Sequence, residues 1–182
     1  GMIMVNNPGS WSNIYAPLKH AEWHGCTPTD WIFPFFLFIV GVAVTLSLTK
    51  RKDRGDDQTK LLLNIFRRAA IIFLVGLFLN GFPGFDFSEI RIPGVLQRIA
   101  VVYFFTSLIF LKTSMKAQIY ITGGLLLFYW FLMGVIPVPG VGEANYEVGK
   151  NLAAWLDNQL LAGHMWKVSK TWDPEGVLST MP

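Results

Sequence analysis

Four long stretches without a charged residue constrain the fold of this chain more than any other feature. The ranges Ile32 to Leu48, Ala69 to Leu79, Ile99 to Leu111 and Ile119 to Ile136 contain no Lys, Arg, Asp or Glu. A helix needs about 20 predominantly apolar residues to cross the ~30 Å hydrocarbon core of a bilayer. Because the stretches approach this length, they predict an all-α polytopic membrane protein, a bundle of transmembrane helices.

The composition agrees with a membrane protein and excludes several other classes. Of the 182 residues, 52% are hydrophobic and only 15% are charged, whereas soluble domains carry about 25% charged residues. A single cysteine, Cys26, excludes an internal disulfide and a cysteine-rich metal site. We expect the formal net charge of +3 to reflect membrane topology, so no nucleic-acid partner is predicted.

We expect one partial transmembrane domain over residues 1–182, a fragment of a larger bundle that is inactive by itself. Residues 1–5 resemble the end of one span, and residues 177–182 the start of another. A long loop over residues 137–176 contains apolar residues at helical spacing between 151 and 161, which predicts an amphipathic helix. The four complete spans are expected near residues 27–48, 61–82, 93–111 and 117–136.

The basic residues predict the orientation of these spans. Five lie between residues 50 and 60, and two more lie in the short connection 112–116. The connection 82–92 carries a single arginine against two acidic residues. Since cytoplasmic loops are enriched in Lys and Arg, residues 49–60 and 112–116 are predicted to be cytoplasmic. Residues 6–26, 82–92 and 137–176 then share the non-cytoplasmic side.

Two histidines in the first non-cytoplasmic loop are candidates for chemistry. His20 and His24 are four residues apart, but the pattern H-x-E-x-H does not match a zinc motif, and Gly25 and Pro28 oppose a continuous helix. No metal site is therefore predicted. A neutral imidazole can act as a general base near neutral pH. The pattern does not choose between the two histidines, and an ordinary aromatic belt with solvated polar groups is the alternative for the loop.

Polar residues inside the predicted spans have two interpretations. Asp30 and Arg98 each follow shortly after the non-cytoplasmic start of a helix, at comparable depth, and Gln97 precedes Arg98. An ionisable residue in a span usually points inward and has a partner. An Asp30–Arg98 ion pair would simply hold two helices together. In the functional interpretation, Asp30 orients or charges the catalytic imidazole and Arg98 contacts substrate.

Arg67 and Arg68 lie on the cytoplasmic side of the second predicted span. Such residues most often extend to the interface and enforce topology. The alternative is that they bind the phosphates of an anionic cofactor that enters from the cytoplasm.

Three sequence blocks resemble a known family. Leu18–Gly41, Arg91–Ala100 and Lys170–Gly176 are similar, in the same order, to blocks of the heparan-α-glucosaminide N-acetyltransferase family and its bacterial relatives. The resemblance implies a multi-spanning enzyme that takes acetyl from acetyl-CoA on the cytoplasmic side. The acceptor is an amine, which is the terminal glucosamine of heparan sulfate for the lysosomal enzyme. It also implies further spans on both sides of this chain.

The resemblance also implies roles for individual residues. The family's catalytic histidine, in a Lys-His-Ala-x-Trp block, corresponds to His20, whereas His24 stands where the lysosomal enzyme has asparagine. Asn6 corresponds to a family asparagine that could stabilise the oxyanion. With Asp30 these residues form the predicted catalytic set, and Arg67 and Arg68 form the predicted acetyl-CoA site. The predicted substrate-binding residues are His24, Gln97, Arg98, Trp172, Asp173 and Glu175.

The sequence therefore predicts an acetyltransferase of the bacterial cytoplasmic membrane, with acetyl-CoA as co-substrate and no metal. Its expected partners are the lipid bilayer and a carbohydrate or amine acceptor, and a homo-oligomer is compatible with this prediction. Direct transfer and transfer through an acetyl-enzyme are both compatible with a neutral imidazole. The alternative function is a transporter or channel in which Asp30, Arg98 and the histidines form an ion or proton path. Inverted repeats would favour that alternative, and the sequence shows none.

Overall fold

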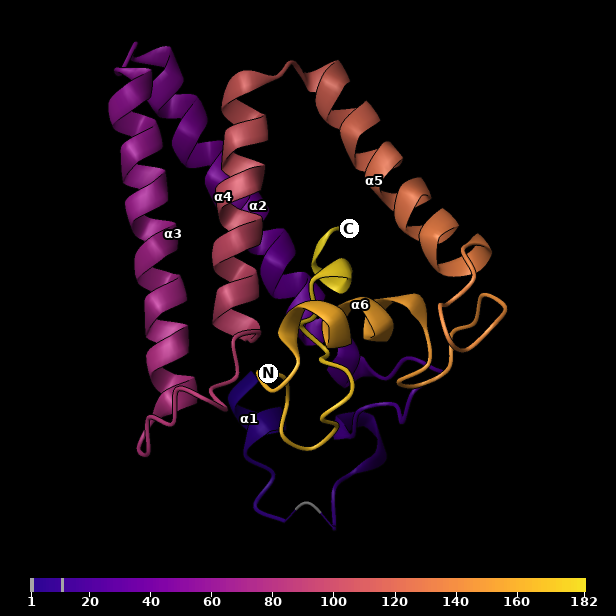
Figure 1. Cartoon of the computed structure of the whole chain (residues 1–182). Coiled ribbons are helices and arrows are strands. Elements are labelled where there is room, and N and C mark those ends of the chain that lie inside the picture. Colours follow the sequence, from indigo (N-terminus) through magenta and orange to yellow (C-terminus); the bar gives the residue numbers. More distant parts are fainter. Residues whose placement is uncertain (1, 11) are drawn as a thin grey trace. The chain divides into compact units, whose positions relative to one another are not determined.

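The computed structural model of the chain describes residues 2–10 and 12–182, and these residues are helical apart from loops and one isolated bridge between Val138 and Gly142 (Figure 1). The described part contains no β-strand, which confirms the predicted all-α class. The elements are α1 (Met2–Asn6), η1 (Ala16–Leu18), η2 (Pro28–Trp31), α2 (Ile32–Asp53), α3 (Gln58–Gly81), α4 (Val95–Lys112), α5 (Met115–Val135), α6 (Leu152–Leu161) and η3 (Leu178–Thr180).

Within residues 2–10 and 12–182, four helical segments are long and apolar enough to cross a membrane, as expected for a polytopic membrane protein. They are Pro28–Asp53, which joins η2 and α2, and the helices α3, α4 and α5. The 22 residues of α2 extend over about 33 Å at 1.5 Å per residue. This length matches the hydrocarbon core of a bilayer.

The chain divides into two compact units, which we describe separately. Unit 1 is Gly1–Ser47 and contains α1, η1, η2 and most of α2. Unit 2 is Leu48–Pro182 and contains the last turns of α2 and all later helices.

Polar side chains determine where the helices of unit 2 begin. The Asp57 carboxylate accepts a hydrogen bond from the Thr59 backbone N–H at 2.8 Å at the start of α3. Ser114 and Asn151 cap α5 and α6 in the same way. Each cap satisfies a backbone N–H group that has no partner within its helix.

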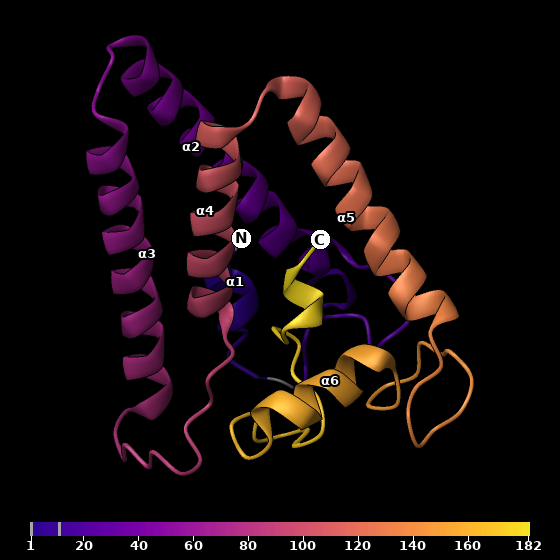
Figure 2. The same cartoon turned by 45° about the horizontal axis from the view of Figure 1, so that its top comes forward.

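Helices α3 and α4 form an antiparallel pair whose contact depends on small residues (Figures 1 and 2). Ala69 and Gly76 of α3 and Ala100 of α4 are buried, so the two helices approach closely. A Cβ atom added at Gly76 would lie 2.5 Å from the Gln97 Oε1 and 2.9 Å from the Leu96 Cβ. The contact therefore leaves no space for a side chain at position 76.

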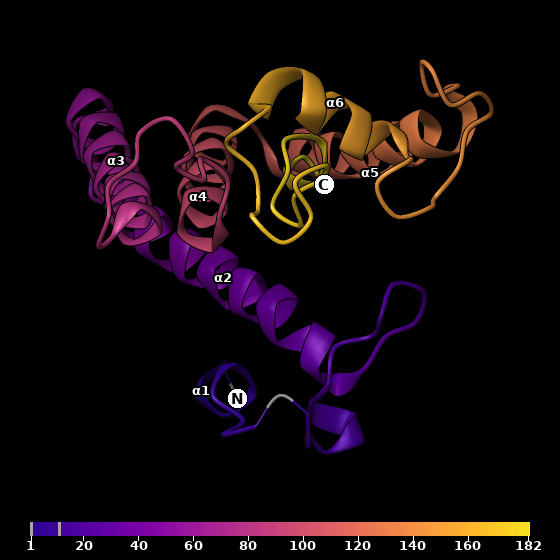
Figure 3. The ribbon, with the colours of Figure 1, turned by 60° about the horizontal axis from the view of Figure 1, so that its bottom comes forward.

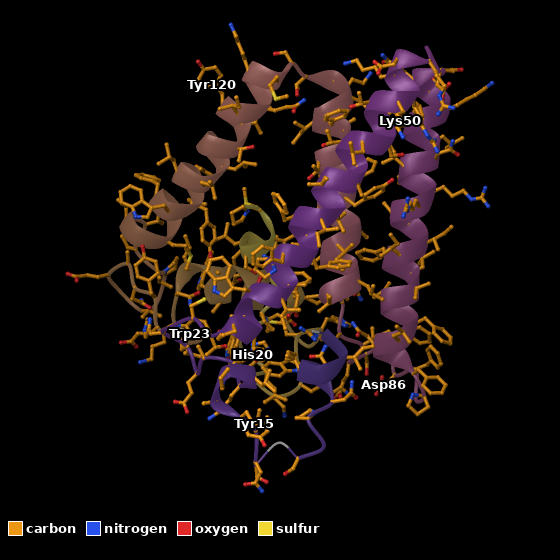
Figure 4. All side chains as sticks on the ribbon, turned by 180° about the vertical axis from the view of Figure 1, so that it is seen from behind. Tyr15, His20, Trp23, Lys50, Asp86 and Tyr120 are labelled. Carbon is orange, nitrogen blue, oxygen red and sulfur yellow. The ribbon has the colours of Figure 1, made fainter. Side chains whose placement is uncertain are left out.

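Unit 2 has a basic end and a loop end. The basic end comprises residues 50–60 and 112–116, and the loop end comprises residues 82–94 and 136–177. Figure 4 labels Lys50 and Tyr120 near the first end and Asp86 at the second. At the loop end, α6 packs on η3 and on α5 (Figure 3). The short C-terminal turn η3 lies between α4 and α5 (Figure 2).

We predict that Gly76→Ala lowers the stability of unit 2 by about 1–3 kcal/mol, because the added methyl group overpacks the α3–α4 contact. The measurement is thermal unfolding of the purified protein in detergent. Gly124→Ala on α5 is the matched control, since no atom lies within 4 Å of the added Cβ there. The control should be neutral or slightly stabilising, and equal melting temperatures for both variants would contradict the packing argument.

Candidate functional site

The start of the first membrane-spanning segment is organised around the Asp30 carboxylate. Thr27 precedes the 3₁₀ turn η2, and Pro28 occupies its first position, where the missing N–H of proline costs no hydrogen bond. The Thr27 backbone N–H and hydroxyl donate to the Asp30 Oδ2 at 2.8 and 3.0 Å. The carboxylate therefore links the first turn of the helix to Thr27, the residue that precedes it.

The same carboxylate binds the loop that precedes the helix. The His20 Nδ1 lies 2.6 Å from the Asp30 Oδ1, and the Ala21 backbone N–H donates to Oδ2 at 3.3 Å. The chain returns from Ala21 to Thr27 through Gly25, whose φ of +126° is readily adopted only by glycine. Asp30 thus connects His20, Ala21 and Thr27 within unit 1.

The imidazole of His20 is held at one nitrogen and accessible at the other side of the ring. Its side chain is 62% exposed, whereas that of Asp30 is 26% exposed. A carboxylate accepts hydrogen bonds, so we assign the proton to Nδ1, which leaves the lone pair on Nε2. This is the arrangement by which a carboxylate fixes the tautomer of a histidine base.

Asp30 therefore pairs with His20, whereas the sequence also allowed an ion pair with Arg98. Asn6 ends α1 and is exposed, and His24 is exposed in the loop. The hydrogen bonds found among the described residues connect neither of them to His20.

An open apolar hollow of about 710 Å³ begins beside Thr27 and is lined by Cys26, Thr27, Pro28, Trp31, Ile32, Phe35, Phe36 and Ile39.

A second polar cluster lies at the loop end of unit 2 and is centred on Asp173. The Arg91 Nε and Nη2 donate to its two carboxylate oxygens at 2.8 and 2.5 Å. The backbone N–H groups of Trp166 and Glu175 donate to the same oxygens at 2.9 and 3.0 Å. With four donors and a fully buried side chain, Asp173 has a structural role, which argues against the predicted contact with substrate.

Arg91 also binds Glu175, at 2.5 Å. Although burial of Arg91 favours its neutral form, the neighbouring carboxylates of Asp173 and Glu175 raise the pKa of the guanidinium above its ordinary value. Burial raises the pKa of Glu175, and the positive charge of Arg91 opposes this shift only in part. The loop 82–94 and the C-terminal segment are therefore joined by a charged, largely buried contact.

The other predicted substrate residues of unit 2 lie on either side of this contact. Arg98 on α4 donates to the Ser179 carbonyl oxygen at 2.5 Å. Gln97 is 4% exposed, and its Nε2 has no hydrogen-bond partner among the described residues. The Trp172 ring packs edge-to-face on that of Trp166, with centroids 5.9 Å apart. Among the described residues, Gln97 thus keeps a polar atom that the loop structure does not use, unlike Asp173.

Asp157 on α6 is a buried acid that the sequence did not reveal. Its carboxylate accepts a hydrogen bond from the Val177 N–H at 2.9 Å and is 2% exposed. A Cβ atom at Gly176 would lie 1.9 Å from the Asp157 Oδ2. The predicted amphipathic helix rests on its apolar residues and assigns no place to Asp157, whereas the structure buries Ala154 and Asp157.

Arg91 is the one basic residue of the short acidic loop 82–92. That isolation is a sequence signal for a carboxylate partner, although it does not identify Asp173.

Arg67 and Arg68 lie in α3, nine and ten positions after its first residue, Gln58. This places them about 14 Å along the helix from its start, on faces about 100° apart. The Arg68 guanidinium lies 5.5 Å from the centroid of the Tyr103 ring on α4, within range of a cation–π interaction. The two arginines therefore have different surroundings, and only Arg68 packs against an aromatic ring of the neighbouring helix in the contacts found.

Among the described residues, no group of three or more His, Cys, Asp and Glu side chains is arranged to hold a metal ion.

Comparisons with known proteins place these residues in context. Residues 15–127 match the family model described as Domain of unknown function (DUF5009). This range includes the His20–Asp30 loop and the start of α4. A heparan-alpha-glucosaminide N-acetyltransferase from Mus musculus is 37% identical over 108 residues, which cover 57% of this chain and 16% of the mouse protein.

The enzyme of the same name from Homo sapiens is 30% identical over 228 residues, which cover 99% of this chain and 34% of the human protein. The matched region thus spans about a third of the length of the human relative and a smaller share of the mouse relative. The similarity to the human protein also covers the C-terminal segment that holds Asp173 and Glu175.

We predict that Asp157→Asn stabilises unit 2 as the pH rises. Burial raises the pKa of Asp157 above its ordinary 3.8, although backbone N–H groups favour the carboxylate. The folded state thus keeps the proton to a higher pH than the unfolded state does. Stability is lost as the pH rises from the ordinary value through the raised pKa. Asparagine imitates the protonated acid, so the variant should avoid this loss.

The measurement is the melting temperature of both proteins in detergent between about pH 4 and pH 8. Asp86→Asn is the control of opposite sign, because hydrogen bonds from Ser88 lower the pKa of Asp86. That variant should lose stability above the ordinary pKa. An Asp157→Asn difference that does not change with pH would show that the buried carboxylate does not titrate differently on folding.

Proposed function

Because the chain belongs to the DUF5009 family, which the match over residues 15–127 establishes, we propose that it forms part of a membrane acetyltransferase with His20 as its base. The resemblance seen in the three sequence blocks is confirmed: the chain is related to heparan-alpha-glucosaminide N-acetyltransferases. Four apolar helices and this relationship make it an integral membrane protein. The observation that carries the proposal is the 2.6 Å contact between the exposed His20 and Asp30.

Acetyl transfer to an amine needs a group that accepts a proton as the new bond forms. The amine nitrogen attacks the thioester carbonyl of acetyl-CoA, and the carbonyl oxygen becomes an oxyanion. The His20 Nε2 takes the proton from the attacking nitrogen, and the charge that develops on the ring is balanced by the Asp30 carboxylate. The C–S bond then breaks, and the CoA sulfur leaves as a thiol after receiving that proton. The products are an amide and CoA.

The two routes to this product differ in what bonds to His20. In direct transfer the imidazole only moves the proton. In the two-step route the Nε2 first forms an acetyl-imidazole, and CoA leaves before the amine attacks. Asn6 is the proposed donor to the oxyanion in either route, with its amide exposed at the end of α1.

We propose that acetyl-CoA approaches from the basic end, which lies in the cytoplasm. Lys50, Arg51 and Lys52 occupy the last turn of α2, whereas Asp30 lies in the turn that precedes the same helix. One span therefore separates the proposed base from the basic residues in the sequence. Arg67 and Arg68 are the proposed ligands for the CoA phosphates. This topology corresponds to a bacterial cytoplasmic membrane, with residues 82–92 and 137–176 on the other side.

The proposed acceptor is the amine of an amino sugar or a similar carbohydrate. This class follows from the name of the mouse and human relatives, heparan-alpha-glucosaminide N-acetyltransferase. The Gln97 Nε2 has no partner among the described residues and could bind a hydroxyl group. Glu175 and Arg98 are the proposed charged contacts, and Trp172 offers a ring of the kind on which sugars stack. His24 is a further exposed contact. Asp173 is not part of this proposed set, since Arg91 and two backbone N–H groups occupy its carboxylate.

We predict that His20→Gln in the intact protein lowers the rate of acetyl transfer by about 10²–10⁴-fold, the usual contribution of a general base. The measurement uses labelled acetyl-CoA and amino-sugar acceptors with protein in nanodiscs. His24→Gln is the matched control and should change the rate by only a few-fold. Equal rates for wild type and both variants would remove the histidine base from the proposal.

We also predict that changing both Arg67 and Arg68 to Gln weakens CoA binding about tenfold or more, because two charge-assisted contacts to phosphate are lost. The measurement is equilibrium binding of CoA to protein in detergent. Lys112→Gln with Lys116→Gln removes the same charge from the α4–α5 turn and should have a smaller effect. Unchanged CoA affinity in the arginine variant would return Arg67 and Arg68 to a purely topological role.

A further inference from the structure

We propose that Thr27 is a positioning residue, whose hydroxyl fixes the Asp30 carboxylate so that it holds the His20 Nδ1–H. This inference rests on the proposed function of His20 and extends it to a residue outside the predicted catalytic set. The geometry that carries it is the contact of the Thr27 hydroxyl with the oxygen of Asp30 that does not face the histidine.

The two oxygens of the Asp30 carboxylate have different tasks. Oδ2 accepts from the Thr27 N–H at 2.8 Å, from the Thr27 hydroxyl at 3.0 Å and from the Ala21 N–H at 3.3 Å. Oδ1 faces the His20 Nδ1 at 2.6 Å. The loop therefore donates hydrogen bonds to Oδ2, and the imidazole of His20 contacts Oδ1.

This division matters because a carboxylate group turns easily about its last torsion, which has a broad energy profile. Three donors on Oδ2 fix that torsion and with it the direction of Oδ1. His20 is 62% exposed, so packing contributes little to its orientation. The imidazole is thus held chiefly through its bond to Oδ1.

Thr27 supplies two of the three donors, one from its backbone and one from its side chain. The backbone N–H remains in any variant except proline, so the hydroxyl is the part that a substitution can remove. The Thr27 hydroxyl must donate in this contact because an ionised carboxylate only accepts. Valine has nearly the same shape without this donor, and serine keeps the donor without the methyl group. The pair of variants therefore separates the hydrogen bond from the shape of the side chain.

The test uses the intact protein in nanodiscs with ¹⁵N-labelled histidine, and His20→Gln assigns the His20 signals. Wild type and Thr27→Ser should show His20 with its proton on Nδ1. In Thr27→Val this tautomer should lose population, and kcat should fall about tenfold, the factor that corresponds to one hydrogen bond. The KM for acetyl-CoA should change less than kcat, since the Thr27 hydroxyl is proposed to act only through the contact of Asp30 with His20.

The proposal is overturned if Thr27→Val keeps the wild-type tautomer, or if Thr27→Ser behaves like Thr27→Val. It is also overturned if Thr27→Val and Thr27→Ala both fail to fold, because Thr27 would then serve stability. The tautomer is read without any assay of transfer. A wild-type protein that shows the expected tautomer but transfers no acetyl would therefore contradict the proposed function and leave the role of Thr27 in orienting the imidazole intact.

Discussion

The hydrocarbon core of a bilayer offers no hydrogen-bond partners, and this constraint determines where the polar side chains of the chain can act. Backbone groups are satisfied within long helices, and most ionisable residues lie at the helix ends or in the loops. At these places, carboxylates accept several hydrogen bonds from backbone and side-chain donors. Asp30 does so at the start of the first span and Asp173 at the loop end of unit 2. The organised parts of both units are built around such acids.

The three carboxylates differ in whether an oxygen atom is left to accept a hydrogen bond from a functional group. Asp173 is fully buried, and four donors use both of its oxygens, so it fixes loops and leaves no atom for a ligand. One oxygen of Asp30 accepts hydrogen bonds from the loop, and the other contacts the exposed imidazole of His20. Asp157 accepts hydrogen bonds from backbone N–H groups, and its burial favours the protonated form. Function is therefore proposed for Asp30, whose partner His20 is exposed.

Periodicity and charge along the sequence were enough to predict the all-α class, because spans depend on local composition. The contact of Asp30 with a histidine could also be predicted from local sequence, because His20 lies only ten residues away. The role of His20 in catalysis stays a prediction. The contact between Arg91 and Asp173 joins residues 82 apart, and no local pattern encodes it. The burial of Asp157 was also missed, since it depends on how the C-terminal segment folds back onto α6.

The close approach of Gly176 to Asp157 has an evolutionary consequence. The carboxylate occupies the space that any side chain at position 176 would need, so the glycine cannot be replaced unless position 157 changes as well. A lineage that replaces the glycine must first shrink or lose the acid, and a lineage that lengthens the acid needs a displaced backbone opposite it. Positions 157 and 176 should therefore co-vary among homologous chains, as a signature of the fold rather than of substrate choice.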